Sequence, residues 1–432
     1  MSFEAAVHAQ AIELDQLSLR MCAEAGSGHP TTAMSLGHIV TVLFFHSMRY
    51  SPENPDYPTS DRLVLSEGHA VPIVYAAAAK VGMHIGKDAG SRRPLSVDEL
   101  GSLREAASVL DGHPNPMEGF PFFDAATGSL GMGLSVAAGL SEAARLDGYD
   151  KRVYCIIGDG EAREGQVAEA LDIVVERGLT GVCTIFNCNE WGQAGRVSGQ
   201  QSAERLASKL EATGFEVIVI DGHRPSEIRD AFERFSERAD SGEGAPIAVV
   251  AKTQKGWGSP SLQGGGWHGK PATGDQLEAA LADLAERRGE LTSTLSSADA
   301  FTIVPPQEVP PMEAAPSSGD MPSLREAMAA RDMTTMLQAG RMATRRAYGV
   351  ALRELGRANP DVVVLDGDVS NSTFAKDFAD DPQLASRFVE CKIAEQNMFS
   401  MAAGLSAAGK VPFVSTFAKF VTRAYDQIEM AI

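Results

Sequence analysis

The chain has 432 residues, of which 44% are hydrophobic and 22% are charged, and its formal net charge is −19. This length exceeds what one ordinary hydrophobic core accommodates, so two or three globular domains are expected. The negative charge argues against a nucleic acid partner, because a phosphate backbone would be repelled.

The start of the chain and its cysteines predict a cytoplasmic protein that does not enter a membrane. No basic segment followed by an apolar run of signal length opens the sequence, and no apolar stretch elsewhere is long enough to span a bilayer. The five cysteines are an odd number without a Cys-x-x-Cys spacing. Free thiols in a reducing compartment are therefore expected.

The first part of the chain predicts an α/β fold with a parallel sheet and helices on both faces. Short apolar runs alternate with helix-length segments, which is the pattern of strands that are buried on both sides. A glycine-rich loop over 255–269 and a helix over 274–290 are expected after the last strand. The strands themselves are expected at 63–65, 153–157, 182–186, 216–220 and 246–251.

A change of composition divides the chain. Two Pro-Pro pairs and the run Pro316-Ser317-Ser318-Gly319 predict an extended linker rather than a packed core. The regular α/β pattern resumes after this segment. We therefore predict a first domain over 1–295, a linker over 296–342 and a second domain over 343–432.

The second domain is predicted to hold a parallel sheet that is incomplete. Its pattern stops after an amphipathic helix, whereas a parallel sheet usually continues beyond such a helix. The last strand would then be an exposed edge, which proteins normally cover. Strands are expected at 362–365, 388–390 and 411–415, and helices at 345–356, 396–408 and from 420 to the end.

Two polar side chains follow neighbouring strands of the first domain. Gly158-Asp159-Gly160 comes directly after one predicted strand, and Asn189 follows the next. Open α/β sheets hold their ligands at the carboxyl ends of such strands. Two hard oxygen donors there suit Mg²⁺ on a substrate's phosphates, and the glycines allow a diphosphate to approach the backbone closely. A lone Gly-Asp-Gly would indicate only a turn, but the pair with a strand before each half is more specific.

A second glycine-rich loop, over 127–133, precedes a helix of small residues over 135–146. Backbone N–H groups at a helix start make this loop a candidate for binding phosphate. A close contact between two helices would require the same small residues. The sequence leaves both interpretations open.

Four of the nine histidines lie beside glycine or proline: His29, His69, His113 and His268. Such neighbours place them in tight loops, which carry chemistry more often than packing does. Any one of them alone would be interpreted as a surface or core histidine. Four in the same context favour groups that bind hydroxyls and move protons. No His-x-x-His or His-Glu-x-x-His spacing occurs in the sequence, so a zinc site is not expected.

The second domain offers two further motifs. Glu395 lies between a strand and an apolar helix, and Phe417 and Phe420 follow the last strand. A carboxylate at a helix start is often a cap, and paired aromatic residues are often core residues. The sequence therefore leaves open whether Glu395 is a helix cap or a functional carboxylate, and whether the two phenylalanines are core or functional residues.

Taken in chain order, these motifs resemble the transketolase family. The resemblance rests on Ser27-Gly28-His29-Pro30, Gly158-Asp159-Gly160 with Asn189, Trp267-His268-Gly269-Lys270 and Ile393-Ala394-Glu395-Gln396-Asn397. The segment 365–374 is similar to the animal form. The match covers nearly the whole chain and implies a thiamine-diphosphate-binding fold with ketol transfer between sugar phosphates, as in the pentose phosphate pathway. It also implies a homodimer with active sites between subunits, so that Glu395 would act on the cofactor of the other subunit.

The resemblance further implies a role for each motif residue. Glu395 would hydrogen-bond the pyrimidine ring of thiamine diphosphate, and His29, His113 and His268 would handle the hydroxyl protons of the sugars. The implied ligands of Mg²⁺ are Asp159, Asn189 and the carbonyl of Trp191. The implied substrate residues are His29, His268, Arg345 and Ser372, and the cofactor residues are Thr32, His69, Gly128, Ser129, Leu130, Gly160, Asn189, Lys255, His268, Phe417 and Phe420.

The chain also departs from the family. Met132 stands where Gln is frequent, Glu67 where Lys or Asn is common, and Trp191 where an aliphatic residue is usual. The family continues beyond this chain's length, so contacts to substrate and a third domain are expected to be missing. Three forms of function remain open. The chain could be completed by a C-terminal transketolase polypeptide, be an inactive remnant that binds the cofactor, or act on another sugar.

Overall fold

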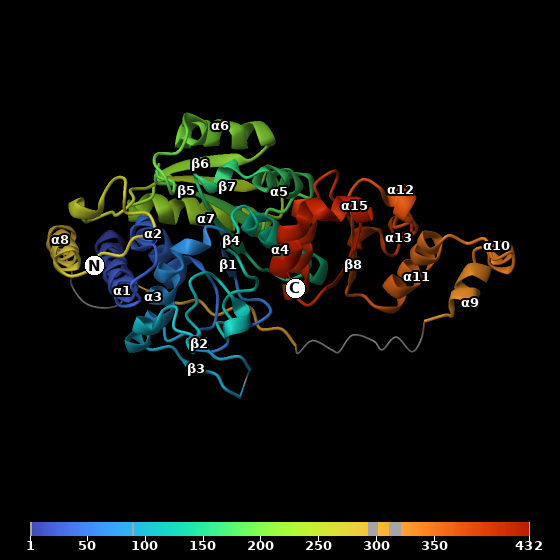
Figure 1. Ribbon diagram of the computed structural model, residues 1–432, viewed down its shortest axis with the longest axis horizontal. Coiled ribbons are helices and arrows are strands. Elements are labelled where there is room, and N and C mark those ends of the chain that lie inside the picture. The colour runs from blue at the N-terminus through green and yellow to red at the C-terminus, as the bar shows by residue number, and fades with distance from the viewer. Residues whose placement is uncertain (1, 89, 293–300, 311–320, 432) are drawn as a thin grey trace.

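Two α/β units lie side by side along the long axis of the molecule (Figure 1). The structure is a computed structural model, and it describes residues 2–88, 90–292, 301–310 and 321–431. The first unit holds a five-stranded sheet and the second a three-stranded sheet, and all pairs within these two sheets are parallel. The predicted fold class, parallel sheets with helices on both faces, is confirmed.

The sheet of the first unit has the strand order β1-β4-β5-β7-β6. The central strands are apolar at most positions and buried on both faces, apart from the exposed Lys252 at the end of β7, which explains their continuous rather than alternating pattern. The five predicted strands are confirmed at β1 (Arg62–Leu65), β4 (Val153–Gly158), β5 (Val182–Cys188), β6 (Glu216–Asp221) and β7 (Ile247–Lys252).

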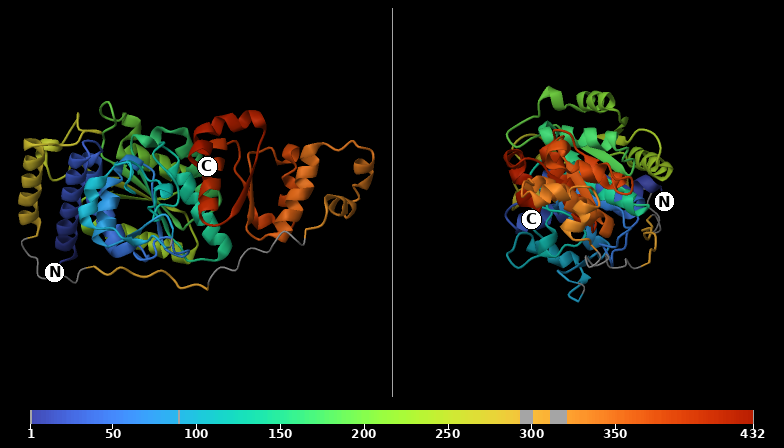
Figure 2. Two further views of the ribbon diagram at one scale, coloured as in Figure 1. Left: turned by 60° about the horizontal axis from the view of Figure 1, so that its bottom comes forward. Right: turned by 90° about the vertical axis from the view of Figure 1, so that its right-hand side faces the viewer.

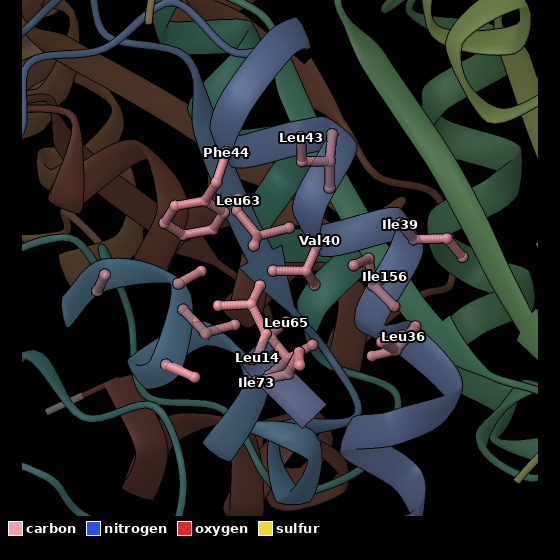
Figure 3. Close-up of a cluster of buried hydrophobic side chains, with 14 of the residues drawn as sticks. Leu14, Leu36, Ile39, Val40, Leu43, Phe44, Leu63, Leu65, Ile73 and Ile156 are labelled. Atoms are coloured by element: carbon pink, nitrogen blue, oxygen red, sulfur yellow. The ribbon is translucent and has the colours of Figure 1, made fainter. Parts of the chain in front are cut away.

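Two layers of helices cover the two faces of this sheet. Successive residues of β4 point to opposite sides, so Tyr154 and Ile156 join one core while Cys155 and Ile157 join the other. The first core is formed with α1 (Phe3–Glu24), α2 (Pro30–Val42), α3 (Pro72–Lys80) and α7 (Pro225–Ser241), and Figure 3 shows part of it. The second is formed with α4 (Gly133–Asp147), α5 (Gly165–Glu176) and α6 (Ala203–Thr213).

Other elements of the first unit lie outside these layers. Helix α8 (Asp275–Leu291) packs on α1 at the end of the molecule away from the second unit (Figure 2). A short antiparallel pair, β2 (His84–Ile85) and β3 (Arg93–Pro94), had no signal in the sequence pattern. Such two-residue strands are too short to produce a periodicity.

The segment predicted as an extended linker is only partly extended. Residues 301–310 run along the first unit, where the Tyr50 N–H donates to the Val304 carbonyl over 2.9 Å. Beyond it, α9 (Leu324–Ala329) and α10 (Thr334–Gln338) are helical. Ser323 and Glu326 form a capping box at the start of α9, and Met328 packs against Val350. Residues 296–300 and 311–320 of the predicted linker lie outside the described part.

The second unit has the strand order β10-β8-β9. Its predicted strands are confirmed at β8 (Val362–Asp366), β9 (Phe388–Glu390) and β10 (Val411–Ser415). The single helix predicted from 420 to the end is wrong, because a 3₁₀ turn at Thr422–Ala424 separates α15 (Ala418–Val421) from α16 (Tyr425–Ala431). The remaining helices are α11 (Thr344–Ala358), α12 (Ser370–Thr373), α13 (Lys376–Ala379) and α14 (Glu395–Ala407).

The two units pack through a close crossing of α4 and α14. A Cβ on Gly139 would lie 2.1 Å from the Met401 carbonyl oxygen, and one on Gly404 would lie 2.1 Å from the Val136 carbonyl oxygen. The crossing therefore depends on the absence of side chains at both glycines. Within the described residues, no helix is long and apolar enough to cross a membrane.

Candidate active site

Asp159 and Asn189 lie together at the carboxyl ends of β4 and β5, as the sequence predicts. The two oxygens of Asp159 accept the Gly160 N–H over 2.7 Å and the Glu190 N–H over 2.6 Å. The Asn189 side-chain oxygen accepts the Trp191 N–H over 3.0 Å. Burial raises the pKa of Asp159 to about 6, although the two N–H donors oppose this shift. These contacts fix the direction of both side chains.

A cavity of about 360 Å³ opens at these strand ends. It contains both oxygen donors of the predicted metal site, together with a lysine and two of the predicted histidines. A cavity at this edge of a parallel sheet is the usual position for a ligand. The lining residues are Glu67, His69, Gly128, Leu130, Gly158, Asp159, Gly160, Glu161, Asn189, Trp191, Gly192, Gln193, Lys255 and His268.

The glycine-rich loop 127–133 lines this cavity through Gly128 and Leu130. Gly128 has a φ of 127°, and a Cβ there would lie 2.7 Å from the His113 ring. Gly68 approaches the same position, since its own Cβ would lie 3.0 Å from the Gly128 Cα. The loop therefore needs glycine both for its backbone conformation and for the contact with His113. The loop itself lies in the cavity, which favours the phosphate-binding interpretation for it, whereas the small residues of the following helix α4 serve a close contact with α14 at Gly139.

Three of the predicted histidines form one cluster beside the cavity. The ring centroids of His29, His69 and His268 lie between 4.8 and 5.1 Å from one another. Burial, with the nearby cationic groups, lowers the pKa of His29 to about 3. Burial and the charge of Lys255 lower the pKa of His268 to about 4. These rings are therefore neutral at pH 7 and each offers one donor and one acceptor.

Lys255 bridges the histidine cluster and the strand ends. Its ammonium donates to Nδ1 of His268 over 2.6 Å, so the neutral ring of His268 carries its proton on Nε2. Burial lowers the pKa of Lys255 to about 8, against the opposing charges of Glu67 and Asp159. This lysine is the cation that an anionic ligand would meet inside a chain of net charge −19.

Glu161 lines the cavity and was missed by the sequence analysis, although it follows Gly160 directly. One carboxyl oxygen accepts the Ser66 hydroxyl and the Gly131 N–H, over 2.5 and 2.7 Å, and the other accepts the Gly158 N–H over 2.9 Å. Burial raises its pKa to about 7. A carboxylate after a turn gives no sequence signal of this bracing role.

Glu67 and Asn187 were also missed as members of the site. The Asn187 amide donates to Glu67 over 2.7 Å and to the Ser35 hydroxyl over 3.0 Å. Burial raises the pKa of Glu67 well above its usual range. Gln201 braces the loop at Asp159 from outside, because its amide donates to the Asp159 and Gly160 carbonyls over 2.8 and 2.9 Å. The sequence marks Glu67 only as an unusual residue before Gly68-His69.

Other predicted residues lie near the cavity without lining it. Thr32 is buried on α2 and its hydroxyl has no hydrogen-bond partner within the described residues. Ser129 donates to Asp426 of α16, so the glycine-rich loop contacts the second unit. His113 lies against Gly128, and burial, with the charge of Arg104, lowers its pKa. The predicted residues of the first unit thus gather at one place.

A second cavity, of about 620 Å³, lies on the second unit. Arg345, Ser372 and Phe417 line it, and Arg345 donates to the Ser372 carbonyl over 3.4 Å. Phe420 stacks on Phe417 with ring centroids 5.4 Å apart. Phe417 is 41% exposed, so the interpretation of this pair as core packing is wrong for Phe417. The structure does not bring Arg345 and Ser372 into the cavity that His268 lines.

Glu395 opens α14 at the border between the units. It is buried, and its two oxygens lie 2.9 and 3.1 Å from one nitrogen of Arg423. The N-cap residue of this helix is Ala394, and no side chain in the described part of the structure caps the helix. The interpretation of Glu395 as a cap is therefore wrong. On the same border, the Asn397 N–H donates to Glu169 of α5 over 3.0 Å, and Glu395 helps to raise the pKa of Glu169 after burial.

The residues of the first cavity fit a metal-bound diphosphate chemically. A carboxylate, an amide oxygen and the carbonyl of Trp191 are hard oxygen donors of the kind that Mg²⁺ takes together with phosphates. Lys255, the histidines and the glycine backbone supply donors for phosphate oxygens. Within the described residues, no group of three His, Cys, Asp or Glu side chains could hold a metal ion by itself.

Comparison with protein families identifies two matching segments. Residues 7–287 match the family described as "Transketolase, thiamine diphosphate binding domain", and residues 340–432 match "Transketolase, pyrimidine binding domain". Human "Transketolase" is 39% identical over 417 residues, which make up 96% of this chain and 61% of the human one. Mouse "Transketolase-like protein 2" is 39% identical over 419 residues, again 96% and 61% of the two chains. The chain thus spans about 61% of the length of these curated relatives.

Solved structures show the same fold. A transketolase from Campylobacter jejuni aligns with a TM-score of 0.75 at 24% identity, over 98% of this chain and 68% of the other. A transketolase from Leishmania mexicana aligns with a TM-score of 0.72 at 22% identity, over 98% of this chain and 66% of the other. These two likenesses concern the fold.

Proposed function

Since the chain belongs to the transketolase family, we propose that it binds thiamine diphosphate with Mg²⁺ and transfers a two-carbon ketol unit from a ketose phosphate to an aldose phosphate. This is a reaction of the pentose phosphate pathway. The observation that carries the proposal is the cavity at the ends of β4 and β5, where Asp159 and Asn189 face Lys255 and neutral histidines. Few other chemistries need oxygen donors for a cation, a lysine and hydroxyl-binding imidazoles in one place.

In this proposal the first cavity binds the diphosphate end of the cofactor. Asp159, Asn189 and the Trp191 carbonyl hold Mg²⁺, and Lys255 and the loop at Gly128 bind phosphate oxygens. His69, Thr32, Ser129, Leu130 and Gly160 complete this part of the site. When bound, thiamine diphosphate supplies an acidic ring carbon and an electron sink for the carbonyl carbon of the ketose.

Glu395, Phe417 and Phe420 belong to the pyrimidine end. The stacked phenylalanines offer an exposed aromatic face for a flat ring, and Glu395 accepts or holds a proton at a ring nitrogen. Both carboxyl oxygens of Glu395 contact one nitrogen of Arg423, so one of these two contacts has to be given up for this role. The strength of the contact with Arg423 therefore determines how readily the Glu395 carboxylate becomes available to the pyrimidine ring.

The sugar would be handled by neutral imidazoles and by a phosphate fork. His29, His113 and His268 are neutral at pH 7, so each can accept a hydroxyl proton and return it. Arg345 and Ser372 suit the terminal phosphate of the sugar, since a guanidinium binds phosphate through two parallel bonds.

We further propose that the protein works as a homodimer in the cytoplasm. Arg345 and Ser372 line a different cavity from the one lined by His268, so one chain alone separates the phosphate residues from the hydroxyl residues. A second copy would supply the missing half to each site, with Glu395 acting in trans. A C-terminal transketolase polypeptide is an alternative partner. The buried free cysteines suit a reducing compartment.

The test is ketol transfer from xylulose 5-phosphate to ribose 5-phosphate with thiamine diphosphate and Mg²⁺. Turnover by the purified chain that disappears in both Glu395→Ala and Asp159→Asn supports the proposal. The matched control is Glu237→Gln, an exposed carboxylate on α7 whose change leaves turnover unaltered. Absence of turnover together with absence of cofactor binding refutes the proposal, and binding without turnover refutes its catalytic part for this chain.

A further inference from the structure

Three histidines outside the proposed active site form a chain of hydrogen bonds around Trp257. They come from three elements: His8 from α1, His38 from α2 and His223 from the turn between β6 and α7. Nδ1 of His8 lies 2.9 Å from Nε2 of His38, and Nδ1 of His38 lies 3.3 Å from Nδ1 of His223. His223 stacks on the Trp257 ring at 5.2 Å, and His38 meets it edge-on at 4.3 Å. None of these residues lines the first cavity.

One backbone contact fixes the proton positions along this chain. Nε2 of His223 accepts the Gln254 N–H over 2.8 Å, so this nitrogen carries no proton. A neutral His223 then has its proton on Nδ1 and donates it to Nδ1 of His38. His38 in turn carries its proton on Nε2 and donates it to His8. Each ring therefore has one allowed tautomer, and all three must be neutral.

The His223 end of this series of hydrogen bonds holds the backbone segment that carries Lys255. Gln254 precedes Lys255, and the next residue, Gly256, donates its N–H to the Thr31 carbonyl over 3.0 Å. The Thr253 hydroxyl donates to Asn187 on the other side. The Gln254 N–H thus ties the backbone beside Lys255 to His223, in the turn between β6 and α7.

We propose that His8, His38 and His223 form a relay of neutral imidazoles that positions the Lys255 segment for its ligand, and that protonation of His8 breaks it. The proposal rests on the proposed function, because Lys255 is there a phosphate ligand. A protonated His8 has hydrogen on both nitrogens and cannot accept from His38. His38, which is fully buried, then loses its partner and the tautomer order of the whole relay is lost.

The surroundings place the sensitive end of the relay at His8. His38 is enclosed, whereas His8 is half-buried and the charges of two neighbouring helices act on it. Glu4 of α1 favours its protonation and Arg287 of α8 opposes it, while burial lowers its pKa. Arg287 also acts on His38, and Asp221 at the end of β6 accepts the His223 backbone N–H over 2.9 Å. The pKa of all three rings is lowered, which agrees with a relay that is neutral at pH 7.

The first test reads the tautomers directly in the full chain without cofactor. Long-range ¹⁵N–¹H spectra of histidine-labelled protein at pH 7.5 are expected to show the proton of His223 on Nδ1 and that of His38 on Nε2. A proton on Nε2 of His223, or on Nδ1 of His38, overturns the proposal. This test does not depend on thiamine diphosphate, so it separates failure of the relay from failure of the proposed function.

The second test measures positioning through ligand affinity. Thiamine diphosphate with Mg²⁺ is titrated against tryptophan fluorescence at pH 7.5 and pH 5.5, in the wild type and in His8→Gln. Glutamine accepts from His38 but does not titrate, so between these two pH values the wild type should lose about threefold more affinity than the variant. His84→Gln, a histidine of β2 outside the relay, should behave as the wild type. Equal losses in the wild type and His8→Gln overturn the proposal.

Discussion

A single methyl group at Gly404 should weaken the packing between the two α/β units. The Cβ of Gly404→Ala would lie 2.1 Å from the Val136 carbonyl oxygen, which is 1.3 Å short of the 3.4 Å where ordinary contact begins. The obstacle is backbone, so no side chain can rotate to make room. Overpacking of this kind typically costs about 1–3 kcal/mol. Because the backbone obstacle cannot give way, the upper part of this range applies, about 2–3 kcal/mol. The helix propensity of alanine returns about 1 kcal/mol, so we expect a net destabilisation of about 1–2 kcal/mol.

The assay is the midpoint of urea unfolding for each variant, monitored both by intrinsic fluorescence and by circular dichroism. The matched control is Gly289→Ala on α8, where an added Cβ meets no atom of the described residues within 4 Å, so only the gain in helix propensity remains. We expect Gly404→Ala to lower the midpoint and Gly289→Ala to leave it unchanged or raise it. A Gly404→Ala protein as stable as the wild type would refute the packing of α14 on α4.

Two further outcomes follow from the site. The pKa values of His29 and His268 lie at about 3 and about 4 in the folded chain, below the usual value of 6.5, so the folded state binds fewer protons than the unfolded state between these limits. The free energy of unfolding should therefore fall as the pH drops from 6.5 towards 4, and it should fall less in the double variant His29→Phe/His268→Phe. The measurement is urea unfolding of both proteins at pH 7 and at pH 5. An equal loss of unfolding free energy in the wild type and the double variant would contradict this. Arg345→Gln should raise the KM for a ketose phosphate about tenfold or more, since a charge-assisted bond contributes about 1.5–3 kcal/mol, while the KM for an unphosphorylated ketose stays the same. A parallel rise for both sugars would show that Arg345 does not meet the phosphate.

Most strands of the sheet could be predicted from the sequence, but few of the hydrogen bonds that hold the site residues in place could be. β4 and β5 were readable because strands buried on both faces are continuous apolar runs, and Asp159 and Asn189 followed from their place at the strand ends. Glu161 and Asn187 could not be recognised, because their partners are distant in sequence. The Ser66 hydroxyl, for example, reaches Glu161 only once β1 and β4 are paired.

The errors in the second unit have local causes. The helix predicted from 420 onwards breaks at Thr422, where the chain forms a 3₁₀ turn and the Thr422 hydroxyl bonds back to the Lys419 carbonyl over 2.7 Å. The linker gains α9 because Ser323 and Glu326 cap it and Met328 finds apolar neighbours. Proline-rich composition on one side of that helix concealed both signals. The predicted domain boundaries at 295 and 342 stay predictions.

The carboxyl group of Glu161 joins three segments that are far apart in sequence: two loops, at Ser66 and Gly131, and the end of β4 at Gly158. None of these segments can move without breaking a bond to the same two oxygens. A ligand that enters the cavity therefore meets walls already in place, and little of its binding free energy is spent on ordering the backbone. Association should be governed by diffusion and charge rather than by a preceding rearrangement, and the rate of cofactor entry should then fall with rising salt.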